Sequence, residues 1–129
     1  WVSTGVTILN STTFPYGIAF DSLGALYIAG YSGNRIQKLA KGASTSVVVA
    51  GNANKIRGGD SYHLNYSVHM TFDENDNMYV SDRGNSRVQY FTKGNLSGTT
   101  VVGITGKIFF SHLFTNCIIC TYRINWKCI

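Results

Sequence analysis

Short apolar runs separated by polar turns recur along most of the chain. Four of them follow one another in the first half, at 18–20, 26–29, 35–39 and 46–50. The run at 26–29 is apolar throughout, as in a strand buried on both faces, whereas 35–39 alternates polar and apolar residues, as in a half-exposed strand. Asp, Gly and Asn are frequent in the turns between them. The pattern predicts four short β-strands in succession.

A second copy of this pattern lies downstream. Phe20 aligns with Phe72 at a shift of 52 residues, and the register of 14–51 on 66–103 holds without a gap. Strand positions stay apolar between the copies, and turn positions keep residues that favour turns. Because so many unlike positions agree in one register, the sequence predicts two structural repeats of one design.

The segments outside the two copies differ from them. Residues 6–9 form a β-branched run that predicts the closing strand of a preceding unit, and 52–66 is a long connection rich in Gly and Asn. Residues 107–129 contain no Gly or Pro and keep no repeat register. We expect 1–106 to be one repeat segment and 107–129 to be an off-pattern tail; the alternative is one further strand at 108–114.

Three motifs in the copies carry a family resemblance. They are Pro15-Tyr-Gly-Ile-Ala-Phe-Asp21, Leu26-Tyr-Ile-Ala29 and Ser32-Gly-Asn-Arg-Ile-Gln37, with counterparts at Phe72-Asp73, Met78-Tyr-Val-Ser-Asp82 and Gly84-Asn-Ser-Arg-Val-Gln89. Together they resemble the NHL repeat. The chain departs from that pattern at Gly30, Ser67 and His69, where the family has Asp, Pro and Gly.

The NHL resemblance implies an all-β chain that forms a partial β-propeller of four-stranded antiparallel blades. We expect about two blades plus the end of a preceding one. A closed NHL-type propeller needs about six blades, so the expected ring is incomplete, roughly a third of it is present and its remaining blades are missing. Because one blade cannot bury both of its faces alone, an exposed apolar edge is also expected.

Net charge is distributed unevenly along the chain. The formal charge of +5 includes Lys107, Arg123 and Lys127 of the tail, which has no acidic residue, so 1–106 carries only +2. This partition weakens the nucleic-acid interpretation that a pI near 9.2 suggests. The three cysteines also lie in the tail and form no disulfide framework there. No apolar run reaches the roughly 18 residues of a membrane span, so none is predicted.

Several charged residues recur at fixed repeat positions and are therefore interpreted as structural. Asp21 and Asp73 follow a strand directly, where a carboxylate caps the next turn. Arg35 and Arg87 follow a turn and are expected to bond carbonyls or carboxylates of neighbouring turns, with Asp82 as the partner of Arg87.

Binding residues are expected in the loops instead, at 30–34, 52–66 and 82–86. Loops on a rigid scaffold commonly supply recognition, and their tips differ between the two copies. The residues predicted to contact a partner are Tyr31, Lys55, Arg57 and Arg83.

No catalytic residue, metal site or cofactor is predicted. His63, His69 and Asp60 are the only nearby histidine and carboxylate group, and they lack the convergent ligand set of a zinc site. The acidic residues 73–76 lack the Gly and Glu of a calcium loop. Cys117 and Cys120 have a bare Cys-x-x-Cys spacing with no second ligand pair.

Three N-glycosylation sequons occur, at Asn10, Asn65 and Asn95. Each falls in a predicted loop, where a used sequon must lie. They favour an extracellular or ectodomain location, although nothing else in the sequence fixes the compartment.

These features favour a non-enzymatic protein-interaction scaffold with a protein as its partner. Two alternatives follow from the NHL resemblance. One is RNA binding through a basic face, as in NHL proteins of the ubiquitin-ligase type. The other is a remnant of a metal-dependent propeller lyase or lactone hydrolase, because a fold does not fix a function.

Overall fold

The structure is a computed structural model that describes residues 3–10 and 14–103. Its elements are β1 (Pro15–Phe20), β2 (Leu26–Gly30), β3 (Arg35–Leu39), β4 (Val47–Gly51), β5 (Ser67–Phe72), β6 (Met78–Asp82), the short 3-10 helix η1 (Arg83–Asn85), β7 (Arg87–Phe91) and β8 (Thr99–Gly103). Within these described ranges, no helix is long and apolar enough to cross a membrane.

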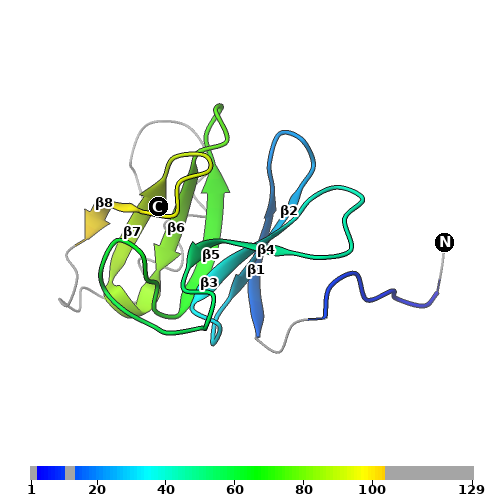
Figure 1. The fold of residues 1–129 in the computed structure, drawn as a ribbon, viewed down its shortest axis with the longest axis horizontal. Helices are drawn as coiled ribbons and strands as arrows, with labels where there is room; N and C mark the ends of the chain where they lie inside the picture. The colour runs from blue at the N-terminus through cyan, green and yellow to red at the C-terminus, as the bar shows by residue number, and fades with distance from the viewer. Residues whose placement is uncertain (1–2, 11–13, 104–129) are drawn as a thin grey trace.

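The strands form two separate four-stranded sheets. Their orders are β1-β2-β3-β4 and β5-β6-β7-β8, and every neighbouring pair is antiparallel. Each sheet is thus a meander in which a short turn joins consecutive strands. Figure 1 shows the two sheets side by side, with β5 next to the first sheet. The predicted fold class, four-stranded antiparallel blades in an incomplete propeller, is confirmed.

The two blades repeat each other down to their irregularities. Each strand of the second blade begins 52 residues after its counterpart. Both blades have a register shift near the start of the first strand and another within the third. Left-handed backbone also recurs: Asn34 and Ser86 have φ values of 50° and 52°, and Gly24 and Asp76 have 79° and 60°. The repeat in sequence is therefore a repeat in backbone geometry.

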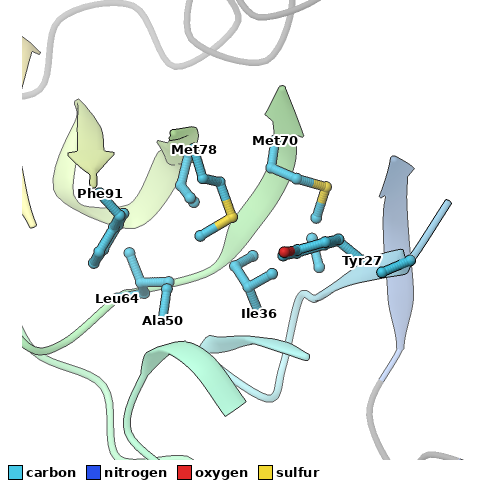
Figure 2. Close-up of a cluster of buried hydrophobic side chains, with 10 residues drawn as sticks. Tyr27, Ile36, Ala50, Leu64, Met70, Met78 and Phe91 are labelled. Atoms are coloured by element: carbon cyan, nitrogen blue, oxygen red, sulfur yellow. The ribbon is translucent and has the colours of Figure 1, made fainter. Parts of the chain in front are cut away.

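The core lies between the blades. Its buried side chains come from both sheets and from the connection, and the largest are Tyr27, Ile36, Leu64, Met70, Met78, Val80 and Phe91 (Figure 2). Tyr27 packs edge-on against Phe72 across the interface, with ring centroids 4.5 Å apart. Complete burial of an apolar side chain of this size stabilises a fold by about 1.5–3 kcal/mol, so this shared core joins the blades.

The opposite face of the first blade is exposed. Ile18 and Phe20 are 64% and 62% exposed, whereas Met70, at the position of Ile18 in the second blade, is 4% exposed. The first blade covers Met70, but among the described residues no blade covers Ile18. A shallow hollow of about 330 Å³ lies in this face, lined by residues including Ile8, Phe20, Leu26, Leu39 and Lys41.

One predicted strand is wrong. Residues 6–9 form no strand, and Ile8 is 63% exposed. A β-branched run forms a strand only when a neighbour accepts its hydrogen bonds, and none of the eight strands pairs with this run. The predicted tail, 107–129, with its cysteines and the alternative strand at 108–114, lies outside the described residues.

Candidate binding surface

Three connecting segments gather at one end of the blades. Gly30 pairs with Arg35, and Arg35 pairs with Gly51, so the β2–β3 turn lies at the end where β4 stops and 52–66 begins. The β6–β7 turn, which contains η1, occupies the matching end of the second blade. We call this end of the molecule the loop end. All three predicted binding loops are located there.

Aromatic and basic side chains pack together at the loop end. We call Tyr16, Tyr31, Tyr66, Arg57 and Arg83 the tyrosine–arginine cluster. The ring of Tyr31 contacts those of Tyr16 and Tyr66, with centroid distances of 5.7 and 4.8 Å. Arg83 Nη1 donates to Tyr31 Oη at 2.8 Å, and Arg57 Nη1 donates to Tyr66 Oη at 3.4 Å. Because Tyr31 and Arg83 belong to different blades, the cluster bridges them.

The structure brings together three of the four residues predicted to bind a partner. Tyr31 and Arg83 are in direct contact, and Arg57 joins them through Tyr66. Lys55 lies in the connection with a left-handed φ of 64°, and its carbonyl accepts a hydrogen bond from Asn34 Nδ2 at 3.1 Å. The binding role of these residues stays a prediction.

Sequence reasoning missed Tyr16 and Tyr66 as members of the cluster. His69 was grouped with His63 and Asp60, yet its ring packs edge-on against Tyr16 with centroids 6.1 Å apart. A signal was present in the repeat comparison, because Tyr66 takes the place of Phe14 and so adds a hydroxyl at one position. That hydroxyl is the group that Arg57 contacts.

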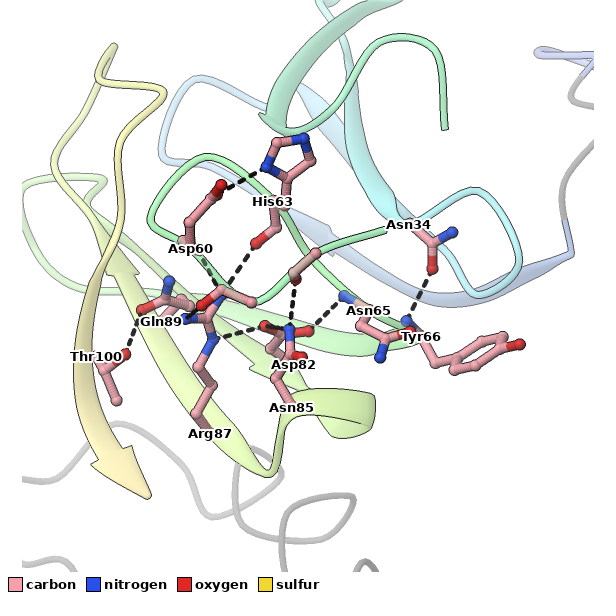
Figure 3. A network of polar contacts seen from close by, with 12 residues as sticks. Asn34, Asp60, His63, Asn65, Tyr66, Asp82, Asn85, Arg87, Gln89 and Thr100 are labelled. Atoms are coloured by element: carbon pink, nitrogen blue, oxygen red, sulfur yellow. Dashed lines mark hydrogen bonds and ion pairs between the residues drawn. The ribbon is translucent and has the colours of Figure 1, made fainter. Parts of the chain in front are cut away.

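Beneath the cluster, a buried ion pair holds the 52–66 connection in place. Arg87 Nε lies 2.7 Å from Asp82 Oδ2, and the side chains are 3% and 0% exposed (Figure 3). Asp82 also accepts hydrogen bonds from the backbone of Asn65 and from Asn85 Nδ2, both at 2.7 Å. Burial raises the pKa of Asp82, and the bonds from Asn85, Asn65 and Arg87 act against this rise. Asp82 and Arg87 thus position the connection.

The two predicted turn aspartates lie at the opposite end of the blades. Asp21 Oδ1 accepts the amides of Leu23 and Ala25 at 3.0 and 2.9 Å. Asp73 Oδ1 accepts the matching amides of Asn75 and Asn77, both at 2.9 Å. Each carboxylate therefore organises its own turn.

The same contacts lower the pKa of both carboxyls. Burial alone would raise the pKa of Asp21, but the amide of Ala25 and the Lys38 ammonium, 3.1 Å away, outweigh it. For Asp73, burial is likewise outweighed, chiefly by the side chain and amide of Asn77. These contacts thus stabilise the ionised form of both groups.

A further contact at this end joins the blades and was not predicted. Asp76 accepts hydrogen bonds from the backbone and hydroxyl of Ser22 at 2.9 and 2.6 Å, and Lys93 Nζ lies 3.1 Å away. The Ser22 hydroxyl and amide, together with Lys93, lower the pKa of Asp76 to about 2. The first copy has Gly24 at this position, so comparing the repeats gave no indication of the contact.

The histidines do not converge on a shared site. His63 Nδ1 lies 2.7 Å from Asp60 Oδ1, and this hydrogen bond lowers the pKa of Asp60. His63 Nε2 lies 3.3 Å from Asn52 Nδ2, whereas His69 contacts Tyr16. In the part of the chain that the structure describes, no group of three or more His, Cys, Asp or Glu is placed to hold a metal ion.

The sequon asparagines differ in their surroundings. Asn10 and Asn95 are exposed, and Asn95 Oδ1 accepts the amide of Ser97 at 2.9 Å. Asn65 is partly buried against Gly84: a Cβ added at Gly84 would lie 2.6 Å from Asn65 Cγ. Of the three, Asn65 is therefore the least accessible acceptor in the folded chain.

Comparison with known proteins supports the blade assignment. Residues 4–36 match the family model for the SBBP β-propeller repeat. This stretch reaches from the N-terminal segment to the second residue of β3. No curated protein matches the chain.

Similar solved structures cover more of the chain than the family model does. Selenomethionine-substituted virginiamycin B lyase from Staphylococcus aureus is similar over 70% of this chain and 27% of its own, with 15% identity and a TM-score of 0.53. A catalytically inactive variant of that lyase with quinupristin shows the same coverage, 18% identity and a TM-score of 0.53. A streptogramin B lyase structure is 20% identical, with a TM-score of 0.48 over 67% of this chain and 24% of its own.

The chain spans about a quarter of the length of these lyases. Identities this low show a likeness of fold alone. The two lyase structures with a TM-score of 0.53, together with the eight strands and their register, establish the architecture. The described part of the chain is an all-β segment made of two β-propeller blades.

Proposed function

We propose that the chain is an NHL-type propeller module that binds a protein through the tyrosine–arginine cluster, without catalysis. The observation that carries this proposal is the contact of Tyr31 with Arg83 across the two blades. Tyr and Arg are the side chains most enriched at interface hot spots, where rigid rings supply contact area and guanidinium groups supply directed donors. The NHL assignment rests on the repeated motifs, and the match to the SBBP model supports the coarser assignment of a β-propeller repeat.

The charges around the cluster indicate the kind of protein. Within the cluster, Arg57 is exposed and Arg83 is half-buried, and Lys55 of the neighbouring connection is also exposed. Asp60 and Asp82, the carboxylates of the loop-end segments, already contact His63 and Arg87. A positive surface with aromatic rings favours an acidic segment of a protein partner.

Fluorescence anisotropy with a panel of labelled acidic, neutral and basic peptides tests the proposal. We expect the acidic peptides to bind best, and Arg83→Ala to weaken their binding about 5- to 30-fold, as loss of a hot-spot side chain does. Lys41→Ala is the matched control, because it removes the same charge from an exposed turn at the other end of the first blade. Equal losses for both variants would contradict a specific surface.

The same assay with labelled single-stranded RNA distinguishes protein binding from the main alternative, which is RNA binding. Tyrosine rings can also stack on bases, and such binding weakens steeply as salt rises. If RNA binds more tightly than the peptides and this binding depends on Arg83, the partner is RNA and not a protein.

A lyase function is the second candidate, favoured only by the fold shared with lyases. Incubation of the chain with quinupristin, with and without Ca²⁺ or Zn²⁺, tests it by mass spectrometry. Metal-dependent conversion of quinupristin would replace the proposal of a non-catalytic module.

A further inference from the structure

The turn between β7 and β8 presents an asparagine to solvent. Asn95 is exposed, and its backbone amide donates to the carbonyl of Thr92 at 2.9 Å, which closes the turn. The amide of Lys93 donates to Asn77 Oδ1 at 3.0 Å, so this turn is fastened to the turn between β5 and β6. That neighbouring turn lies at the end of the blades opposite the loop end. Asn95 is therefore held on the surface in an ordered turn, away from the tyrosine–arginine cluster.

The side chain of Asn95 also has its amide nitrogen available. Asn95-Leu-Ser97 is one of the three sequons, and Asn95 Oδ1 accepts the amide of Ser97 at 2.9 Å. This bond holds the asparagine and the hydroxyl residue of the sequon close together. Asn95 Nδ2 donates to no other residue of the described ranges. Leu96, between the two, is 52% exposed, so the whole sequon faces solvent or lies at the surface.

The sequon at Asn65 has the opposite surroundings. The backbone amide of Asn65 donates to Asp82 Oδ1, and its carbonyl accepts the amide of Gly84, both at 2.7 Å (Figure 3). Asn65 Oδ1 is buried, and a Cβ added at Gly84 would lie 2.7 Å from Asn65 Nδ2. The amide nitrogen thus lies against η1. An oligosaccharide is bulky and belongs on a surface, so the folded chain has no room for one at Asn65.

We propose that the folded chain carries an N-linked oligosaccharide at Asn95 and none at Asn65. The donor is an oligosaccharide linked to a lipid through a diphosphate, and a membrane-bound transferase supplies the catalysis. Asn95 Nδ2 forms a bond to the anomeric carbon of the first sugar, and the bond between that carbon and the diphosphate oxygen breaks. The lipid diphosphate leaves with the electron pair, and Nδ2 gives up one proton. Transfer precedes folding, so the fold decides which of these glycans the finished chain can hold.

The first blade provides the same turn without the asparagine. Ala43 takes the place of Asn95 at the shift of 52 and is exposed as well. Its amide donates to the carbonyl of Ala40 at 2.9 Å, which is the counterpart of the bond that closes the Asn95 turn. Gly42 and Gly94, which precede Ala43 and Asn95, have φ values of 79° and 81°. The two turns therefore match in geometry, and only the second carries an acceptor.

Translation of the full chain behind a secretion signal, into vesicles of the endoplasmic reticulum, tests the proposal. The sequon at Asn10 extends beyond the described residues, so Asn10→Gln is present in every chain. Peptide N-glycosidase in heavy-oxygen water then converts a glycosylated asparagine to a labelled aspartate, which mass spectrometry locates. In the soluble chain we expect the label at Asn95 and none at Asn65. An unlabelled Asn95 beside a labelled reference glycoprotein in the same vesicles, or label at Asn65 in the soluble chain, would overturn the proposal.

Variants of the two turns separate the sequon from its surroundings. Asn95→Gln and Ser97→Ala each remove one required group and should abolish the label, whereas Ser97→Thr keeps the hydroxyl and should retain it. Ala43→Asn completes a sequon with Ser44 and Thr45 on the matching turn of the first blade and should add a second label. A label at Asn95 that survives Ser97→Ala, or an Ala43→Asn chain without a second label, would overturn the assignment to an exposed sequon turn.

The glycosylation site and the proposed function can fail separately. The Asn95 oligosaccharide lies at the end opposite the tyrosine–arginine cluster, so glycosylated and enzymatically deglycosylated chain should bind acidic peptides equally. Weaker binding by the glycosylated chain would contradict this placement. Label at Asn95 without binding of any peptide overturns the proposed function alone. Peptide binding that depends on Arg83, with an unlabelled Asn95, overturns the glycosylation site alone.

Discussion

Gly17 lies where β1 and β5 approach so closely that no side chain fits. A Cβ added there would be 2.3 Å from the carbonyl oxygen of Val68 and 2.9 Å from His69 Nδ1. Since the nearest atom belongs to backbone, the strands would have to move apart. We expect Gly17→Ala to lower the free energy of unfolding by about 1–3 kcal/mol, the usual cost of overpacking. Urea unfolding measures this, with Gly5→Ala as control, because no atom lies within 4 Å of a Cβ at Gly5. Similar losses in both variants would contradict the close approach.

The contact that Asp76 makes between the blades should become weaker in acid. Its pKa in the folded chain is about 2, below the ordinary value of 3.8. A carboxyl with a lowered pKa contributes stability that is complete above its unfolded pKa and is lost as the pH falls through its folded pKa. We therefore expect the free energy of unfolding to fall between about pH 4 and pH 2. The Asp76→Asn variant should lose less of its free energy of unfolding over this range.

The comparison of urea midpoints at pH 5 and pH 2.5 measures that difference. Asn suits the left-handed backbone at this position, φ 60°, so the variant isolates the charge from the turn. Asp21 and Asp73 also have lowered pKa values. Their contributions to stability are therefore lost in acid both in the parent chain and in the Asp76→Asn variant. Identical acid losses in the parent chain and in Asp76→Asn would show that Asp76 does not stabilise the interface between the blades.

At the scale of elements, strands could be predicted because their determinants are local. The run at 26–29 corresponds to β2, and the alternating run at 35–39 is β3 with the same bounds. Because the second copy repeats the pattern of the first, the strands of the second sheet could be predicted from those of the first sheet. Residues 6–9 show the limit of this reasoning, since strand formation needs a partner strand that the pattern cannot supply.

The candidate site was predictable only in part, because it arises between elements. Tyr31 and Arg83 were identified as loop residues that differ between the copies, but their mutual contact depends on how the blades pack. The bond from Ser22 to Asp76 and the approach of Tyr16 to Tyr31 have the same origin. Contacts that differ between copies carry no periodic signal, so only the three-dimensional arrangement shows them.

At the scale of the whole molecule, equivalent positions in the two blades have opposite surroundings. Ile18 and Met70 occupy the same place in their strands, yet one faces away from the second blade and the other is covered by the first. The same substitution should therefore act differently at the two positions. We expect Ile18→Thr to change the free energy of unfolding by less than about 0.5 kcal/mol, as exposed substitutions do. Met70→Thr should lower it by about 2 kcal/mol or more, because it leaves a cavity and a buried hydroxyl.

The exposed face adds a second expectation for the same pair. Ile18 and Phe20 belong to an apolar surface that resembles the face of the second blade buried in the core. Ile18→Thr removes part of this surface, so it should reduce binding of the dye 1-anilinonaphthalene-8-sulfonate and reduce aggregation on heating. Met70→Thr should raise both, since it loosens the contact between blades. Urea unfolding and dye fluorescence on the two variants measure these effects. If Ile18→Thr destabilises the chain as much as Met70→Thr, then Ile18 is covered in solution and the first blade has a further partner on that face.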